Sequence, residues 1–214
     1  MSETTSFDLN AFIKESKETL LSPNTYFPAM RTSGGMAEPV MKALIYGVIA
    51  GIIAFLWGVL GLGGSLGVFG AGIGAMALVW TIVGALIGLF IGAVIMLIIS
   101  AICKGSTDFE ANLRVVAAVM VLMPINALLG FTMGINSVFG AIVTLGVNLY
   151  GLYLLYHGLT GSLKANAATS KIVMYVLAGL LVLFTIAGMS TRNKMNKYMD
   201  MSQEELKEML KDTD

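Results

Sequence analysis

The sequence predicts an all-α polytopic membrane protein with five transmembrane helices and amphipathic helices at both ends. Three long stretches contain no Asp, Glu, Lys, Arg or His, and they run from Ala43 to Cys103, from Val115 to Tyr156 and from Ile172 to Thr191. A helix needs about 20 mostly apolar residues to cross the hydrocarbon core of a bilayer, so the stretches hold two, two and one crossings. Backbone polar groups in lipid must be paired within their own segment, which makes each crossing a helix.

The composition supports this class and excludes several others. Of the 214 residues, 57% are hydrophobic and 12% are charged, against roughly 25% charged in a soluble domain. The net charge is zero, so nothing predicts nucleic acid as a partner. The single cysteine, Cys103, excludes a disulfide within the chain. The first 40 residues have no apolar core segment of the secretory kind, so we expect no signal peptide.

The chain divides into three parts: an N-terminal cytosolic or interfacial segment over residues 1–39, a transmembrane domain over residues 40–190, and a charged tail over residues 191–214. The first part opens with a predicted amphipathic helix from Phe7 to Leu21 with Ser6 as its N-cap. This helix either lies in the interface plane with its apolar stripe toward lipid or packs on the cytosolic ends of the membrane helices.

A proline-containing linker is predicted to follow that helix. Pro23 ends the helix, because the residue before a proline disfavours helical geometry. Within the linker, Tyr26 and Phe27 are expected to anchor the chain at the level of the lipid headgroups.

The first crossing is predicted from about Val40 to Leu60, with Lys42 extending its ammonium to the interface. Gly47 and Gly51 form a small-xxx-small pair that allows another helix to approach closely. The glycine-rich stretch from Gly61 to Gly74 is the natural turn, since glycine lowers helix propensity. A re-entrant element is the alternative for this stretch, provided that protein or a wet cavity surrounds it.

The second crossing spans about Met76 to Cys103 and carries a glycine repeat. Gly84, Gly88 and Gly92 recur every four residues and therefore share one helix face. This spacing is a glycine zipper and predicts a contact stripe between helices.

The third and fourth crossings, about Leu113 to Met133 and Val138 to Tyr156, contain the polar groups of interest. Pro124 lies in the middle of the third crossing and predicts a kink there. Asn126 and Asn148 place amides in the hydrocarbon, either for hydrogen bonds between helices or along a solute pathway.

An aromatic girdle is predicted near the end of the fourth crossing. Tyr150, Tyr153 and Tyr156 recur every three residues, as in the interfacial aromatic belts of membrane proteins. The fifth crossing follows from about Ile172 to Ser190.

The tail is predicted to form a short separate amphipathic helix from about Gln203 to Lys211, because Ser202 and Glu205 make a capping box before it. Basic residues set orientation, and they occur in the N-terminal segment and in the second and fourth loops but not in the first and third. This pattern predicts an N-terminus inside. Five crossings then put the tail outside although it carries five basic residues, which conflicts with the same rule.

Three stretches combine prolines, glycines and aromatic residues in a characteristic way: Leu20–Met30, Val115–Gly130 and Tyr150–Val173. In these stretches the chain resembles the Yip1 family of integral membrane proteins. The resemblance covers most of residues 7–190. Eukaryotic members of the family associate with small GTPases and carry an acidic aromatic-Gly-Pro motif; the motif is missing here, so that association is not implied. Bacterial members are more similar, which implies the bacterial cytoplasmic membrane.

No constellation of catalytic residues is visible. The sequence has no phosphate-binding loop, nucleophile elbow or H-E-x-x-H motif. His157 is the only histidine, which excludes a histidine-based metal site within one chain. Asp108 and Glu110 are interpreted as part of a solvated loop. The hydrocarbon-embedded parts of the crossings hold no ionisable group, which argues against a proton-coupled pump.

These observations favour a protein that is not an enzyme and needs no cofactor. The first hypothesis is a scaffold or adaptor that organises the lipid bilayer, a second copy of itself or a membrane protein partner through its glycine-faced helices and amphipathic ends. The alternative is a permease or channel for a small neutral solute or lipid. That alternative rests on the Pro124 kink with its neighbouring amides and on a re-entrant glycine-rich stretch.

Overall fold

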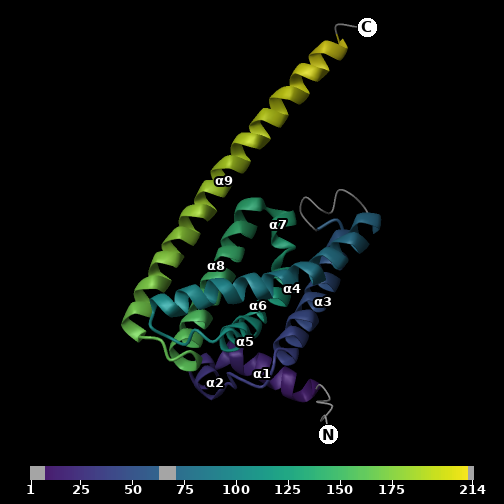
Figure 1. The fold of residues 1–214 in the computed structure, drawn as a ribbon. Coiled ribbons are helices and arrows are strands. Elements are labelled where there is room, and N and C mark those ends of the chain that lie inside the picture. The colour runs from purple at the N-terminus through teal and green to yellow at the C-terminus, as the bar shows by residue number, and fades with distance from the viewer. Residues whose placement is uncertain (1–7, 63–70, 212–214) are drawn as a thin grey trace.

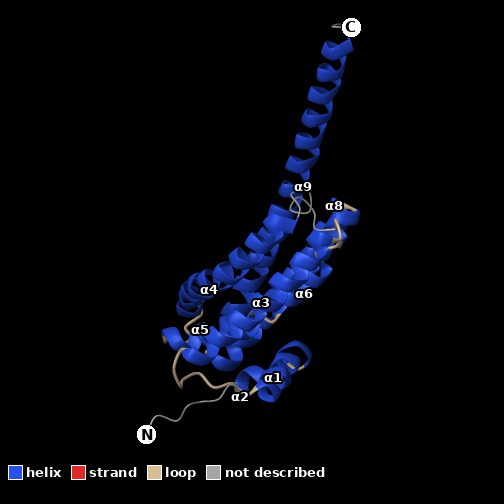
Figure 2. Cartoon of the chain, turned by 90° about the vertical axis from the view of Figure 1, so that its right-hand side faces the viewer, coloured by secondary structure: helices blue, strands red, loops and turns tan. Residues whose placement is uncertain are grey.

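Every regular element in the described part of the chain is helical (Figures 1 and 2). The computed structural model describes the backbone of residues 8–62 and 71–211 and the side chains of residues 8–62 and 79–189. The exclusively helical structure of these residues confirms the predicted all-α class. In chain order the elements are α1 (Leu9–Leu21), α2 (Pro23–Ala29), α3 (Ala37–Val59), α4 (Ala71–Ile102), α5 (Phe109–Val119), α6 (Leu122–Leu129), α7 (Thr132–Ile135), α8 (Ser137–His157), the π-helical turn η2 (Gly158–Ser162) and α9 (Ala167–Lys211).

Five helical segments of the described residues are long and apolar enough to cross a membrane, as the sequence predicts. Their ends lie within three residues of the predicted ones, except that the third begins four residues earlier, the fourth ends six residues later and the fifth begins five residues earlier. The re-entrant alternative for Gly61–Gly74 stays a prediction, because residues 63–70 lie outside the described part. The segments are Ala37–Val59, Val79–Ile102, Phe109–Ile135, Ser137–Ser162 and Ala167–Met189.

The N-terminal segment differs from its predicted form. Asp8 caps α1, because its carboxylate accepts hydrogen bonds from the amides of residues 10 and 11 at 2.9 and 3.2 Å. The predicted cap, Ser6, lies outside the described residues. Pro23 ends α1 as predicted, but it also begins α2 at a position where a proline has no amide hydrogen bond to lose. The stretch predicted as a linker is therefore helical up to Ala29.

Helices α1 and α2 lie across one end of the membrane helices (Figures 1 and 2). Tyr26 and Phe27 point into the protein, with 8% and 0% of their surface exposed. The prediction that they anchor the chain among headgroups is wrong. The cover is close because two glycines of η2 face α2: a Cβ at Gly158 would lie 3.5 Å from the ring of Phe27, and one at Gly161 would lie 2.9 Å from the ring of Pro28.

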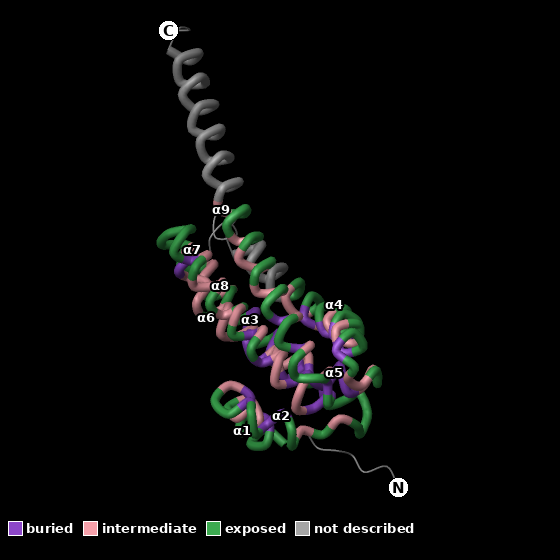
Figure 3. The backbone as a smooth tube through the Cα atoms, turned by 90° about the vertical axis from the view of Figure 1, so that its left-hand side faces the viewer, coloured by how far each residue is buried: buried purple, intermediate pink, exposed green. Residues whose placement is uncertain are grey.

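The core is organised around α5. Leu113 and Ala117 pack with Ala43 of α3 and with Leu89 and Ala93 of α4. The opposite side of α5 contributes to a second cluster that also contains Phe27 and the buried leucines of α8 and η2. Five consecutive α5 residues, 111–115, are buried, so the helix has no exposed side at this level (Figure 3).

The third crossing is interrupted just before Pro124, where the sequence predicts a kink; the bend itself stays a prediction, but the interruption has a local cause. Helix α5 ends at Val119 and α6 begins at Leu122. Pro124 has no amide hydrogen to donate to the carbonyl of Met120, and the amide of Met123 donates to that carbonyl instead at 2.9 Å. The shortened turn separates the two helices.

Helix α9 is continuous over 45 residues, about 68 Å at 1.5 Å per residue. The predicted separate helix at Gln203–Lys211 is wrong, since the same helix runs through its start. Asn166 caps the beginning of α9 by accepting a hydrogen bond from the amide of Thr169 at 3.0 Å. The far part of α9 extends beyond the other helices, away from α1 and α2 (Figure 1).

Candidate functional site

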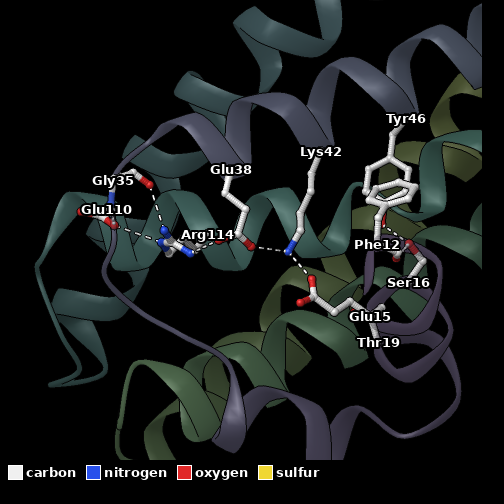
Figure 4. A network of polar contacts seen from close by, with 10 residues as sticks. All are labelled: Phe12, Glu15, Ser16, Thr19, Gly35, Glu38, Lys42, Tyr46, Glu110 and Arg114. Carbon is white, nitrogen blue, oxygen red and sulfur yellow. Dashed lines mark hydrogen bonds and ion pairs between the residues drawn. The ribbon is translucent and has the colours of Figure 1, made fainter. Parts of the chain in front are cut away.

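The most polar part of the described structure is a cluster of charges where α1 and α2 meet the membrane helices (Figure 4). The ammonium of Lys42, on α3, lies 2.6 Å from a carboxylate oxygen of Glu15 on α1 and 2.8 Å from one of Glu38 on α3. Only 10% of the Lys42 side chain is exposed. The prediction that Lys42 extends to the interface is therefore wrong, because its charge is paired inside the protein.

Arg114 of α5 continues the cluster. Its guanidinium lies 2.8 Å from the second carboxylate oxygen of Glu38 and 3.0 Å from Glu110, and it donates a hydrogen bond to the carbonyl of Gly35 at 2.9 Å. The amide of Gly35 donates to Glu110 at 2.7 Å. Glu38 thus joins the two cations by using one oxygen for each.

Two glycines shape the loop that closes on Arg114. Gly34 and Gly35 have φ angles of +126° and +94°, which L side chains rarely adopt. A Cβ at Gly34 would also lie 3.2 Å from the guanidinium of Arg114. The loop reaches the arginine because both positions lack a side chain.

The prediction of a solvated loop holds for Asp108, which is exposed just before α5, and is wrong for Glu110, which lies in the helix. Helix α5 begins at Phe109, and Asp108 is its N-cap, with its carboxylate accepting from the amide of Ala111 at 2.7 Å. Glu110 lies in the first turn and pairs with Arg114. Both acidic side chains have structural partners.

We call Glu15, Glu38, Lys42, Glu110 and Arg114 the charge cluster. Its three carboxylates and two cations sum to a charge of −1. Ions removed from water are stabilised only when they are paired and hydrogen-bonded, and both cations of the cluster meet this condition. The cluster connects α1, α3 and α5, which are separated in the sequence.

Hydroxyl and aromatic groups extend the contact between α1 and α3. The hydroxyls of Ser16 and Tyr46 lie 2.7 Å apart, and the Tyr46 ring lies 5.0 Å from that of Phe12. Burial raises the pKa of the Tyr26 phenol above its ordinary value, although the nearby Lys42 ammonium opposes this. Tyr26 therefore stays neutral beside the cluster at physiological pH.

A cleft of about 520 Å³ opens between the charge cluster and α2. Its volume is in the range of ligand pockets, about 300–1,000 Å³. The cluster's cations are held by carboxylates, and the described residues contain no group of three side chains that could hold a metal ion. The cleft is lined by Glu15, Glu18, Thr25, Tyr26, Ala29, Met30, Arg31, Glu38, Pro39, Lys42, Arg114 and Ala117.

The glycines that the sequence groups by spacing have different surroundings in the structure. A Cβ at Gly47 would lie 2.8 Å from the Cβ of Ala85, so α3 and α4 touch there. Gly51 is buried, and Gly92 faces Val116 of α5 at 3.0 Å. Gly84 and Gly88 are exposed, and a Cβ at either would meet no atom within 4 Å, so contact of this face with another molecule stays a prediction.

The structure does not bring the residues of the predicted pathway into one channel. Pro124 and Asn126 are half-buried on α6, whereas Asn148 is exposed on the outer face of α8. Near the interruption between α5 and α6, the indole of Trp57 donates to the carbonyl of Ala127 at 3.0 Å. A role for the two amides in transport stays a prediction.

The tyrosines of α8 form a series of tilted and edge-on ring contacts that includes His157. The rings of Tyr150 and Tyr153 lie 5.6 Å apart, and Tyr153 and Tyr156 both contact the ring of His157. The hydroxyl of Tyr150 donates to the carbonyl of Leu20, at the end of α1. Their position at a membrane interface stays a prediction.

Sequence reasoning missed the charge cluster. Its visible signals were two pairs at a spacing of four residues, Glu38 with Lys42 and Glu110 with Arg114, which neighbour each other on a helix surface. Neither pair indicates that Glu15 completes the group, because that contact depends on how α1 packs.

Comparison with known proteins gives one match. A family model described as the Yip1 domain matches residues 17–189, most of the chain and all five candidate membrane segments. No curated protein and no solved structure matches the chain.

Proposed function

This chain belongs to the Yip1 family of membrane proteins, and we propose that it is a non-enzymatic scaffold that holds a second copy of itself or another membrane protein against its outward helix faces. The observation that carries this proposal is the isolation of α9. That helix packs mainly on α8 and η2, and only 6% of its membrane segment is buried. A helix with one neighbour leaves most of its circumference for a partner.

The outward face of α4 offers a second contact surface. Ala85, Leu89 and Ala93 of this helix are buried against α3 and α5. Gly84 and Gly88 lie on the exposed side, where small residues let the backbones of two membrane helices approach closely. Association in lipid depends on such close packing, since lipid tails are as apolar as leucine.

The charge cluster supports a role without catalysis. A general acid or base needs a group free to exchange a proton with substrate. Glu15, Glu38 and Glu110 are each engaged by a cation. We assign the cluster to holding α1 and α2 in place, with the cleft beside it open to a partner.

We also place α1 and α2 on the cytosolic side of a bacterial cytoplasmic membrane. The basic residues of α1, of the loop after α2 and of the loops before α5 and α9 lie at this end, which supports this orientation by the positive-inside rule, although the five basic residues of the tail at the opposite end count against it. Single cysteines at Lys14 and Lys164, in a Cys103→Ala background, should react with a membrane-impermeant maleimide only after the cells are opened. Labelling in intact cells would reverse the orientation.

Native mass spectrometry after gentle extraction tests the scaffold. The wild type is expected to give a complex of defined mass, either a homo-oligomer or a fixed-ratio pair with one membrane protein. Gly88→Leu should dissociate it. Gly146→Leu, at an exposed α8 glycine that also has no atom within 4 Å, is the matched control and should not. A wild-type monomer, or equal behaviour of the two variants, contradicts the proposal.

The competing proposal is a permease for a small neutral solute or lipid. The half-buried amide of Asn126 beside the Pro124 break supports it. Liposomes containing the protein should then pass glycerol or a labelled phospholipid, and Asn126→Leu should abolish the flux. An inactive wild type, or an active variant, removes this proposal.

A further inference from the structure

A groove between α8 and α9 has the features of a lipid site. We propose that it binds an anionic phospholipid, with the phosphate beside Lys171 and an acyl chain along the groove floor. The groove has a volume of about 360 Å³. It is lined by Leu149, Leu152, Tyr153 and Tyr156 of α8 and by Lys171, Met174, Tyr175 and Ala178 of α9. This inference is independent of the scaffold proposal.

The lining changes from polar to apolar along the helices. Lys171 lies in the second turn of α9, and Tyr153 and Tyr156 lie in the last turns of α8, so these groups meet at the same end of the membrane segments. Ala178 lies seven residues beyond Lys171, about 10 Å deeper at 1.5 Å per residue. A phospholipid has the same order, with a charged headgroup at the surface and hydrocarbon below.

The charge of the groove selects an anion. Lys171 is its one charged lining residue, and the lining has no acidic side chain. Within the described residues the ammonium has no ion pair and lies 5.8 Å from the centre of the Tyr175 ring, a cation–π arrangement that leaves its charge uncompensated. A phosphate would supply the missing negative charge, and tyrosine hydroxyls can donate hydrogen bonds to it.

The groove is open on the side that faces lipid. Tyr153 and Tyr175 are 48% and 66% exposed, while Met174, at 6% exposure, forms a buried floor. A lipid can therefore enter laterally from the bilayer. The volume accommodates a phosphate and the upper part of one chain, with the remainder in the surrounding lipid.

Native mass spectrometry in nanodiscs tests the site. The full-length protein is placed in mixed phosphatidylglycerol and phosphatidylcholine, then released, and the retained lipids are counted. The wild type is expected to retain one phosphatidylglycerol. Lys171→Gln should reduce this retention about fivefold, the effect of one basic residue near an anionic surface. Ala178→Phe fills the deeper part of the groove and should reduce it although Lys171 is intact.

Lys104→Gln is the matched control, because Lys104 is an exposed lysine in a loop at the same end and does not line the groove. It should retain lipid as the wild type does. Circular dichroism of each variant verifies folding. The proposal is overturned if the wild type retains both lipids equally, or if the two lysine variants lose phosphatidylglycerol equally. It is also overturned if retention in Ala178→Phe is unchanged. A wild type that retains no phosphatidylglycerol, as a monomer or as a dimer, also overturns it.

Discussion

Glu15 and Lys42, 27 positions apart in the sequence, form the shortest ion pair described in the structure, at 2.6 Å between carboxylate oxygen and ammonium nitrogen. The pair joins the peripheral helix α1 to the membrane helix α3. Since Glu15 is 38% exposed and Lys42 only 10%, the carboxylate can rehydrate if the contact opens, whereas the ammonium loses a partner that water does not replace.

Lys42→Gln should loosen α1 without unfolding the membrane helices. We expect the opening free energy of α1 amides to fall by about 1.5–3 kcal/mol, the scale of hydrogen bonds to charged groups. Hydrogen exchange resolved by segment measures this. Lys14→Gln is the control, because its pair with Glu18 spans 3.9 Å and its side chain is 75% exposed; exposed pairs contribute about 0–1 kcal/mol. Equal effects of the two changes would contradict the assigned role of Lys42.

Tyr26 should make the α1–α2 segment sensitive to alkaline pH. Its folded-state pKa is raised by burial above the ordinary value of about 10. The neutral phenol therefore stabilises the folded segment fully below pH ~10, and this stabilisation is lost as the pH rises through the raised pKa of Tyr26. Limited proteolysis between pH 8 and 11 should show faster cleavage of the segment at the alkaline end. Tyr26→Phe should remove most of this pH-dependent increase in cleavage. If the variant is as sensitive to pH as the wild type, a group other than Tyr26 causes the increase.

Gly47→Ala should destabilise the contact between α3 and α4. The added methyl would lie 2.8 Å from the Cβ of Ala85, and overpacking of this kind costs about 1–3 kcal/mol. The same change at Gly88, where no atom lies within 4 Å, should be neutral or stabilising by up to about 1 kcal/mol through helix propensity. Reversible unfolding in mixed detergent micelles compares the two. Rescue of Gly47→Ala by Ala85→Gly would assign the loss to this pair.

Pro124→Ala should join α5 and α6 into one helix, because the new amide can donate to the carbonyl of Met120. The change should disturb the hydrogen bond from the Trp57 indole to Ala127, 3.0 Å in the wild type. In a Trp80→Phe background Trp57 is the sole tryptophan, so its emission maximum reports the change. An unchanged spectrum would mean that the break persists without the proline.

The membrane segments were predictable because bilayer thickness sets the length of an uncharged run. An irregularity beside Pro124 was predictable because a proline removes one particular hydrogen bond, and the interruption between α5 and α6 lies there. The packing side of α4 was not, since a helix in lipid is apolar on every face. The spacing of Gly84, Gly88 and Gly92 indicates a shared face, but only the structure shows that Ala85, Leu89 and Ala93 face inward.

The helical α2 and the continuous α9 escaped prediction for different reasons. The prolines of α2 suggested a linker, but one of them occupies the first helical position and Phe27 has a buried site to fill. A capping box suggested a new helix in the tail, yet the same residues are compatible with the interior of an existing one. Local signals show where a helix can begin, and tertiary packing determines whether it does.

The close cover of α2 by η2 imposes an order on biosynthesis. The hydroxyl of Ser162 donates to the carbonyl of Phe27 at 2.7 Å across 135 positions. A ribosome adds roughly 5–20 residues per second, so about 7–27 seconds pass between the synthesis of Phe27 and that of Ser162 in η2, which encloses it. During that interval an aromatic segment without its binding site is available to chaperones and to the insertion machinery. The N-terminal helices are made first and reach their final positions only when the fourth membrane helix has been completed.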